Sequence, residues 1–177
     1  MDIVATDDKR NVTDEFRGMS VEKIKQTLDE RRQPLQIAIE NLERDFNMGT
    51  IVRSANAFNV SVVHIIGRKQ WNRRGAMVTD KYMNIQYHRS VEEFIVAVDG
   101  LQIIGVDNVM GSVPLASIQL PRDCVLVFGS EASGISDTMI TACQQVVAIE
   151  QFGSTRSINV GVAAGVVMYE WLRQNVL

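Results

Sequence analysis

Short apolar runs alternate with helical patterns along the chain from about residue 35 onward. The runs have the continuous apolar character of strands that are buried on both faces, and the segments between them repeat apolar residues at helical spacing. This alternation predicts an α/β fold with a mainly parallel sheet and helices on both faces. We expect strands at 35–39, 60–66, 102–106, 124–128 and 146–149, and helices at 50–58, 91–98, 136–143 and 159–173.

The first 34 residues have a different pattern. Val21, Ile24 and Leu28 fall at helical spacing after Ser20, which can cap a helix, and Pro34 is expected to end the run. The apolar stripe is narrow, so this helix is expected to pack against the rest of the chain or against a partner subunit. We therefore divide the chain into a helical appendage, residues 1–34, and one main domain, residues 35–177.

Composition restricts the class of protein. The 177 residues are 46% hydrophobic and 22% charged, which suits one globular domain with a buried core. Cys124 and Cys143 lack metal-ligand spacing and are too few for a disulfide framework, so a reducing compartment is expected and no metal is. Because no signal peptide and no apolar run of about 20 residues is present, we expect a cytoplasmic protein without a membrane span.

Charge is unevenly distributed along the chain. The total is −3, but residues 64–89, here called the basic segment, contain six Lys and Arg against one acid, together with Trp71 and Tyr82. Clustered cations with interleaved aromatic residues are typical of surfaces that bind a phosphate backbone. A solvated loop is the commoner explanation of such a run and stays open at this point. The candidate nucleic-acid-binding residues are Arg68, Lys69, Arg73, Arg74 and Lys81.

Several familiar catalytic motifs are missing from the sequence. No G-x-G-x-x-G follows the first expected strand, which weakens a conventional dinucleotide site. Residues 129–136 have the glycine spacing of a phosphate loop, but Ile135 replaces the required lysine. Ser133 is not part of a G-x-S-x-G, so a hydrolase is unsupported. His64 and His88 are isolated in the sequence, and we expect both to be structural.

Three segments remain in which small and polar residues directly follow an apolar strand. They are residues 41–58, 125–135 and 147–164. Open α/β sheets bind ligands at this position, beyond the carboxyl ends of their strands. In order and spacing, the three segments resemble the three signature motifs of the SpoU (TrmH) family of RNA ribose methyltransferases, within the SPOUT superfamily. The resemblance covers residues from about 35 to 175, including Tyr-Glu-Trp-Leu-Arg-Gln at 169–174.

The resemblance implies a fold, an activity and an assembly. The fold is a SPOUT-type domain over residues 35–177 whose C-terminal part is threaded as a trefoil knot. The activity is transfer of a methyl group from S-adenosylmethionine (AdoMet) to a ribose 2′-hydroxyl of RNA. Residues 70–82 also look like the branch that methylates a tRNA guanosine, in the D-loop. The assembly is a homodimer with sites near the subunit interface.

The resemblance also assigns candidate cofactor contacts by position. They would fall at Gly129, Ile149 and Ile158, with the stretch from Gly105 to Asn108 close by. These residue types suit an adenine ring, which needs apolar walls and a few backbone donors and acceptors.

Candidate catalytic residues follow from the same resemblance. Arg53 would clamp the phosphate beside the reacting ribose, because a guanidinium binds phosphate in bidentate fashion and stays protonated. Asn47 would orient Arg53 or the ribose, and Glu131 would hold the loop of the second motif. Ser157 and Asn159 would line the knot loop near the reacting centre. For Asn47, Ser157 and Asn159, simple helix capping is the alternative.

The chain departs from the family pattern at a few positions. Asp45 replaces a proline of the first motif, and Asn59 replaces its final glycine, a swap that asparagine tolerates in the left-handed conformation. Glu150 and Gln151 replace the Pro-Met of the third motif, which leaves the cofactor loop less stiff.

Two alternative functions stay open beside methylation of tRNA. Ribosomal RNA is the first, although its methyltransferases often carry a separate N-terminal RNA-binding domain and residues 1–34 are too short for one. The second is an RNA-binding module that keeps the fold without turnover.

Overall fold

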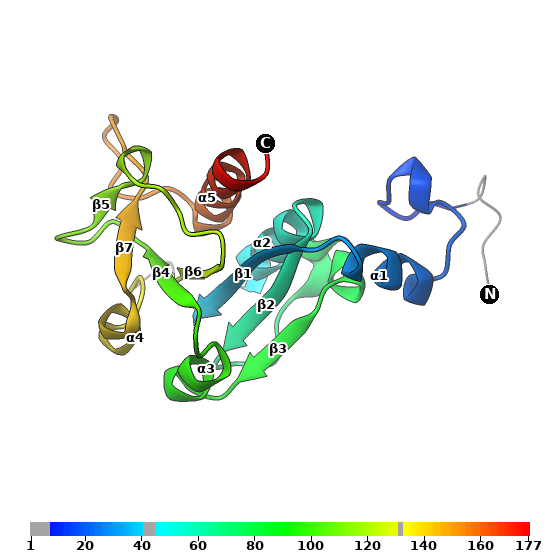
Figure 1. The fold of residues 1–177 in the computed structure, drawn as a ribbon, viewed down its shortest axis with the longest axis horizontal. Coiled ribbons are helices and arrows are strands. Elements are labelled where there is room, and N and C mark those ends of the chain that lie inside the picture. The colour runs from blue at the N-terminus through cyan, green and yellow to red at the C-terminus, as the bar shows by residue number, and fades with distance from the viewer. Residues whose placement is uncertain (1–7, 41–44, 131–132) are drawn as a thin grey trace.

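The chain folds around one twisted sheet that is parallel throughout (Figure 1). The computed structural model describes residues 8–40, 45–130 and 133–177, and only the backbone of Asp45 and Phe46. In these residues the strands are β1 (Gln33–Glu40), β2 (Val60–Ile66), β3 (Ile85–His88), β4 (Gln102–Val106), β5 (Val113–Pro114), β6 (Cys124–Phe128) and β7 (Gln145–Ala148). The α-helices are α1 (Val21–Asp29), α2 (Asp45–Ala57), α3 (Val91–Ala97), α4 (Asp137–Ala142) and α5 (Val160–Asn175).

The order of the strands contains one switch point. The order is β3-β2-β1-β6-β4-β7-β5, so the chain first builds outward from β1 through β2 to β3 and then crosses to the other side. The connections that leave β1 and β6, which are neighbours, therefore run in opposite directions. In open parallel sheets this arrangement leaves a crevice at the carboxyl ends of the strands, where ligands bind.

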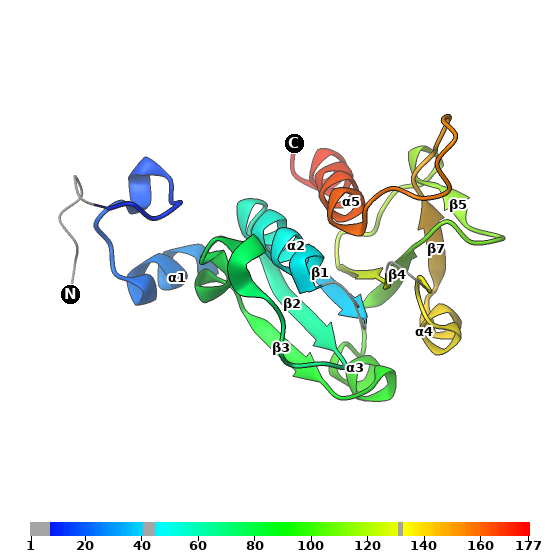
Figure 2. The same cartoon turned by 180° about the vertical axis from the view of Figure 1, so that it is seen from behind.

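Helices cover both faces of the sheet (Figures 1 and 2). On one face α2 and α5 lie side by side and bury Ile51, Val167 and Trp171 against the strands. On the other face α3 and α4 bury Phe94 and Met139. Each such side chain contributes about 1.5–3 kcal/mol when it is fully removed from water. The apolar strands are thus buried from both sides, as their continuous apolar runs predict.

The predicted α/β architecture is confirmed, with corrections at several elements. The expected strands at 60–66, 102–106 and 124–128 have the bounds of β2, β4 and β6. Helix α2 begins at Asp45, five residues before the expected start. Pro34 lies inside β1 and does not end a helix, since α1 already ends at Asp29. Strands β3 and β5 were not expected, because both are short and neither is a continuous apolar run.

Helix α1 forms as its sequence predicts and packs on the basic segment. The Ser20 hydroxyl accepts a hydrogen bond from the Lys23 amide at 3.3 Å, which caps the helix. Ile24 and Leu28 are buried in a small cluster with Phe16 and Tyr82. Tyr82 belongs to the 3₁₀ helix Thr79–Tyr82 between β2 and β3. Helix α1 therefore packs on the 3₁₀ helix Thr79–Tyr82 of the basic segment, in the part of the molecule far from β5 and β7 (Figure 1).

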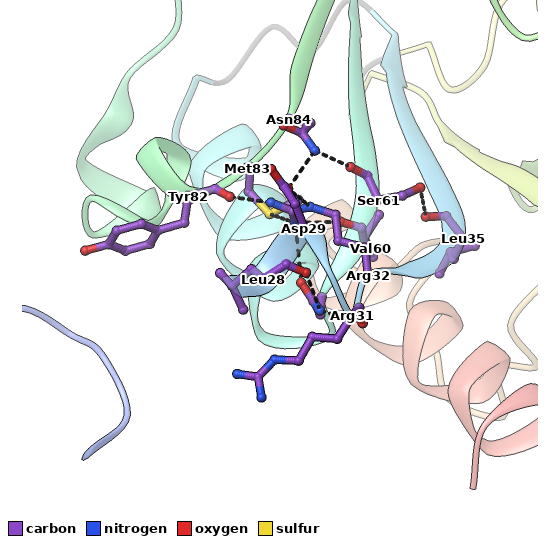
Figure 3. Close-up of polar contacts among 11 residues, drawn as sticks. Leu28, Asp29, Arg31, Arg32, Leu35, Val60, Ser61, Tyr82, Met83 and Asn84 are labelled. Carbon is purple, nitrogen blue, oxygen red and sulfur yellow. Dashed lines mark hydrogen bonds and ion pairs between the residues drawn. The ribbon is translucent and has the colours of Figure 1, made fainter. Parts of the chain in front are cut away.

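Arg32 fixes the turn between α1 and β1 (Figure 3). Its Nε donates to the Asp29 carboxylate at 2.6 Å, and its two terminal nitrogens donate to the carbonyls of Val60, at 3.1 Å, and Tyr82, at 2.6 Å. Only 6% of the Arg32 side chain is exposed, so little water competes for these bonds. Charged hydrogen bonds of this kind each stabilise by about 1.5–3 kcal/mol. One arginine thus joins α1, the start of β2 and the 3₁₀ helix Thr79–Tyr82 of the basic segment.

Candidate active site

A cavity of about 630 Å³ opens at the carboxyl edge of the sheet, between the loops that follow β4, β6 and β7. We call it the carboxyl-edge cavity. Its walls bring together six of the residues that the sequence predicts for the site, namely Asn108, Gly129, Ile149, Ser157, Ile158 and Asn159. Its volume lies within the roughly 300–1,000 Å³ of ordinary small-molecule sites. A larger and more open hollow of about 1,120 Å³ lies between α3 and α4, but none of the predicted site residues lines it.

The loop after β6 forms one wall of the carboxyl-edge cavity. Ser130 and Gly134 exchange two backbone hydrogen bonds, of 3.0 and 2.9 Å, so the chain folds back on itself. Gly134 has a φ of +70°, which favours glycine. A Cβ atom on Gly129 would lie 2.1 Å from the backbone carbon of Gly134, which leaves no room for any side chain. The wall is therefore backbone, held at a spacing that only glycine permits at Gly129.

Two carboxylates hold the end of this loop from the neighbouring strands. Asp107, directly after β4, accepts hydrogen bonds from the amides of Ile135 at 2.8 Å and Asn108 at 2.7 Å. Glu40, the last residue of β1, accepts from the Ser136 amide at 3.0 Å and from its hydroxyl at 2.5 Å. Glu40 was not predicted as a site residue, and Asp107 was expected only as part of the stretch from Gly105 to Asn108. The only sequence signal is that each carboxylate stands at the carboxyl end of a strand.

Asn159 joins the first and third motifs. Its Nδ2 donates to the Oδ1 of Asn47 at 3.0 Å, across 112 residues of sequence. Its Oδ1 accepts from the amides of Gly161 at 2.9 Å and Val162 at 3.3 Å, which caps α5. Capping and a site contact, treated above as alternatives, therefore coexist in Asn159. Asn47 is inside α2 and is not its cap.

Helices α2 and α5 approach closely beside the carboxyl-edge cavity. A Cβ atom on Gly161 would lie 3.1 Å from the Thr50 side chain, and one on Gly165 would lie 4.0 Å from the Ser54 hydroxyl. Small residues at this spacing on α5 thus face α2 and let the helices pack together. Arg53 is exposed on α2 and is not among the residues lining the cavity. Its guanidinium makes no hydrogen bond or ion pair with any residue that the structure describes.

One predicted cofactor residue falls elsewhere. Gly105 does not line the carboxyl-edge cavity. It lies in β4, where a Cβ atom would meet the side chains of Cys143 and Ile135 at 3.2 Å on the face covered by α4. Its neighbour Val106 does line the cavity. Glu131 lies outside the described residues.

The basic segment packs closely against α2. Its five predicted contact residues are all exposed, and they are Arg68, Lys69, Arg73, Arg74 and Lys81. The 3₁₀ helix Arg73–Ala76 sits so close to α2 that a Cβ atom on Gly49 would lie 2.6 Å from the Ala76 amide nitrogen. Arg73 lies 5.8 Å from the centre of the Trp71 ring and pairs with Asp80 at 3.3 Å. The segment is therefore ordered and does not have the form of a loose solvated loop.

Other reactive groups lie apart from this site. Burial raises the pKa of the Cys124 thiol to about 12 and that of Cys143 to about 11, so both thiols are protonated at neutral pH. In the described part of the chain, no three His, Cys, Asp or Glu side chains are grouped as a metal site would require. No helix in that part is long and apolar enough to cross a membrane.

Comparisons with known proteins agree with this geometry. The profile of the SpoU rRNA Methylase family matches residues 34–169. The tRNA (guanosine(18)-2′-O)-methyltransferase of Escherichia coli K12 is 27% identical over 150 residues, covering 81% of this chain and 66% of the relative. This chain thus spans just under two thirds of that protein's length.

Solved structures share the fold. The A. aeolicus TrmH/SpoU tRNA modifying enzyme has a TM-score of 0.77 at 24% identity, over 87% of this chain and 81% of its own. The AdoMet-bound rRNA methyltransferase from Sinorhizobium meliloti has a TM-score of 0.74 at 24% identity, over 85% of this chain and 60% of its own.

Proposed function

The chain belongs to the SpoU rRNA methylase family, and from that premise we propose that it is an AdoMet-dependent RNA methyltransferase that modifies a ribose 2′-hydroxyl. One observation carries the proposal. The second and third motifs form the walls of a single cavity, and the hydrogen bond of 3.0 Å between Asn47 and Asn159 attaches the first motif to them. Three segments that are far apart in sequence thus meet at the edge of the sheet where ligands bind.

The residues of the carboxyl-edge cavity suit AdoMet. Ile149 and Ile158 provide apolar walls for an adenine ring, and the loop at Gly129 offers backbone groups at close approach. Asp107 and Glu40 hold that loop, so its shape is set before any ligand binds. When bound there, AdoMet would supply an electrophilic methyl group on its sulfonium sulfur.

Arg53 has a positioning role in this proposal. Methyl transfer is an in-line displacement, so the protein must hold the ribose hydroxyl on the axis of the breaking bond. The exposed Arg53 guanidinium can clamp an adjacent RNA phosphate in bidentate fashion, and because it stays protonated it does not accept the hydroxyl proton. The Asn47–Asn159 pair sets the start of α2 relative to the cavity and so the direction in which α2 carries Arg53.

We propose that the active form is a homodimer. Val162, Val166 and Tyr169 on α5 are 57%, 42% and 53% exposed, at a spacing that places them on one face of the helix. Phe58, at the end of α2, lies 6.3 Å from the ring of Tyr169. Burial of this stripe against a second copy would bring Arg53, on the adjacent helix, to the subunit interface. The resemblance further supports a trefoil knot in the C-terminal part of the domain, with residues 1–34 as an appendage to it.

We favour tRNA as the substrate, with a guanosine of the D-loop as the target. The name of the E. coli relative supports this choice, and so does the basic segment, which presents five exposed cations beside α2. The rRNA methyltransferase among the similar structures keeps ribosomal RNA as the second candidate. A module that binds RNA without turnover is the third.

A methylation assay tests the proposal. Purified protein is incubated with labelled AdoMet and unmodified tRNA transcripts or ribosomal RNA fragments, and the product nucleoside is mapped by mass spectrometry. We expect 2′-O-methylguanosine in the tRNA D-loop. Arg53→Ala is expected to lower the rate at least about a hundredfold, since loss of alignment alone has that effect, with AdoMet affinity unchanged.

The controls separate the alternatives. Arg53→Lys keeps the charge and loses the bidentate geometry, so its rate should fall between those of Arg53→Ala and the parent protein. Equal methylation rates in the parent protein, Arg53→Lys and Arg53→Ala would show that Arg53 does not position the RNA. If label appears in ribosomal RNA alone, the substrate is ribosomal RNA and not tRNA. If the protein binds RNA tightly but transfers no methyl group to any RNA, it is an RNA-binding module without turnover.

A further inference from the structure

Two apolar side chains beside the carboxyl-edge cavity are left almost entirely in water. Among the large apolar side chains that the structure describes, Met110 and Phe152 are the most exposed, at 102% and 98%. Met110 lies in the loop between β4 and β5, and Phe152 lies in the loop between β7 and α5. Both loops contribute residues to the lining of the cavity. Single exposed apolar residues are common on proteins, but the two most exposed ones on loops beside one cavity indicate a surface that a ligand covers.

The loop that carries Phe152 is held on both sides of this residue. Before it, the Glu150 carboxylate accepts a hydrogen bond from the Ala116 amide at 3.1 Å. After it, the Arg156 carbonyl accepts one from the Asn108 side chain at 3.3 Å, which joins the loop to the one after β4. The loop projects beyond the sheet (Figure 1). Phe152 is therefore presented to solvent from a tethered loop, so less order has to be gained when a ligand covers the ring.

The residues around Phe152 suit nucleic acid. Residues 151–159 contain no acidic side chain, and the exposed Ser154, Thr155 and Arg156 follow the ring. Arg156 also lines the cavity. Single-stranded RNA binds to an aromatic face beside an arginine, because a base stacks on the ring and the guanidinium attracts the phosphate or a second base. In the proposed reaction a ribose must reach the cavity, which brings its base or the next one to this loop.

We propose that Phe152 stacks on an unpaired base of the RNA, at or next to the methylated nucleotide. This inference rests on the proposed function. It adds an RNA contact that is separate from the basic segment, since α5 lies between α2 and this loop in both views (Figures 1 and 2). Every base has a π face, so Phe152 holds the nucleotide in place without selecting its sequence.

The test measures tRNA binding by fluorescence anisotropy in the presence of S-adenosylhomocysteine, the demethylated form of AdoMet, which cannot transfer a methyl group. Phe152→Leu keeps an apolar side chain and removes the aromatic face, so we expect the affinity for tRNA to fall about tenfold. Phe152→Trp keeps an aromatic face, and its affinity should stay within about twofold of the parent value or rise. Val96→Ala, a change at an exposed apolar residue of α3, is the control and should bind tRNA as the parent protein does.

Synthetic tRNAs that lack a single base identify the stacked nucleotide. The base is removed at each position of the D-loop in turn, and the ribose with its 2′-hydroxyl is kept. At the stacked position this loss should weaken binding to the parent protein but cost no further affinity in Phe152→Leu, because both changes remove the same contact. Full additivity at every position would overturn the inference. If the methylation assay identifies ribosomal RNA as the substrate, that RNA replaces tRNA in these measurements.

A second copy of the chain is the other surface that could cover Phe152. In that case Phe152→Ser would shift the protein toward monomer in sedimentation without RNA, which would overturn the inference. We expect unchanged sedimentation and an unchanged Tm, because the exposed ring makes little contact with the rest of the chain. If the parent protein methylates RNA and Phe152→Leu binds that RNA equally well, the inference fails and the proposed function stands. If the parent protein neither binds nor methylates RNA, both fail.

Discussion

The carboxyl-edge cavity and the basic segment are both connected to helix α2, yet they differ in how closely the fold holds their residues. The cavity is lined by backbone and by small, apolar and polar side chains, Asp107 and Arg156 among them, and Gly129 leaves no space for even a methyl group. The basic segment presents long charged side chains to solvent, and of its arginines Arg73 is held by Asp80 and the Trp71 ring. A small ligand that must be enclosed requires fixed backbone geometry, whereas a phosphate chain requires charge at approximate positions.

Helix α2 holds these two regions in one arrangement. Gly49 lies against the 3₁₀ helix of the basic segment, while Asn47 and Thr50 contact the third motif and α5. The two sets of contacts are on adjacent residues of one helical turn, so the cavity and the basic segment cannot shift independently of α2. Arg53, farther along the same helix, is therefore carried at a set distance from both regions.

The largest difference between the two regions is expected when a side chain is added at Gly129, because this should affect cofactor binding and not RNA binding. In Gly129→Ala the new methyl group would lie 2.1 Å from the Gly134 backbone, so the cavity wall must move. Overpacking against backbone costs about 1–3 kcal/mol or more. We expect the affinity for S-adenosylhomocysteine to fall by about a hundredfold in calorimetry, with the affinity for tRNA unchanged.

Gly153→Ala is the matched control for this substitution. Gly153 lies in the loop between β7 and α5, and a Cβ atom there meets no atom within 4 Å. Its affinity for S-adenosylhomocysteine should stay within about twofold of the parent value, the scale of a surface change. Equal losses in both variants would show that the loop after β6 is not a rigid wall.

The basic segment is tested by removing two of its positive charges and measuring how tRNA affinity depends on salt. Arg73→Ala combined with Arg74→Ala should weaken tRNA binding about tenfold near physiological salt. The slope of log affinity against log salt should fall in magnitude by about 1.5, since each phosphate contact contributes about 0.7–0.9. Fluorescence anisotropy with labelled tRNA over a salt series measures both quantities, and affinity for S-adenosylhomocysteine should not change.

Arg122→Ala provides the comparison for the double variant. Arg122 is exposed and lies two residues before β6, at the amino end of the strands and away from the carboxyl-edge cavity. Its removal should leave the salt slope as it is in the parent protein. An unchanged slope in the Arg73 and Arg74 variant would mean that the basic segment does not contact RNA phosphates.

The two regions also differ in how far the sequence predicts them. Mostly apolar runs predicted the bounds of β2, β4 and β6, because strands buried on both faces have few polar residues, here Ser61 and His64 in β2 and Gln102 in β4. Asn59 adopts the left-handed conformation expected of it, with a φ of 51°. The basic segment is evident from its charge and aromatic residues, since its cations cluster in one stretch of the sequence and need no tertiary contact to be recognised.

The contacts that hold the cavity together could not be predicted in the same way. Asp107 and Glu40 are single carboxylates without a characteristic spacing, and their role depends on which loop the fold places beside them. The early start of α2 at Asp45 has a similar cause, because its first turn lacks an apolar repeat. The exposure of Met110 and Phe152 beside the cavity becomes visible only when the packing of both loops is known.

A row of buried, hydrogen-bonded polar side chains distinguishes the half of the sheet that contains β1, β2 and β3. His64 Nδ1 lies 2.9 Å from His88 Nε2, and His64 Nε2 lies 2.7 Å from the Gln36 oxygen, so three neighbouring strands are joined. Both rings pack edge-on to Phe94 of α3. Burial lowers the pKa of His64 to about 4 and also lowers the pKa of His88, which Glu93 partly offsets.

Acid should therefore weaken this half of the sheet before the other. A histidine whose folded pKa is below the unfolded value of about 6.5 contributes full stability above that pH, and the contribution is lost as pH falls toward 4. We expect the free energy of unfolding to drop by about 2 kcal/mol between pH 7 and pH 5 from His64 alone. Denaturant unfolding in that range measures it, before most carboxylates titrate. His64→Gln keeps a donor and an acceptor but cannot become charged, so its unfolding free energy should vary less with pH, whatever its value at pH 7. The same pH dependence in both proteins would show that the buried pair is not what titrates.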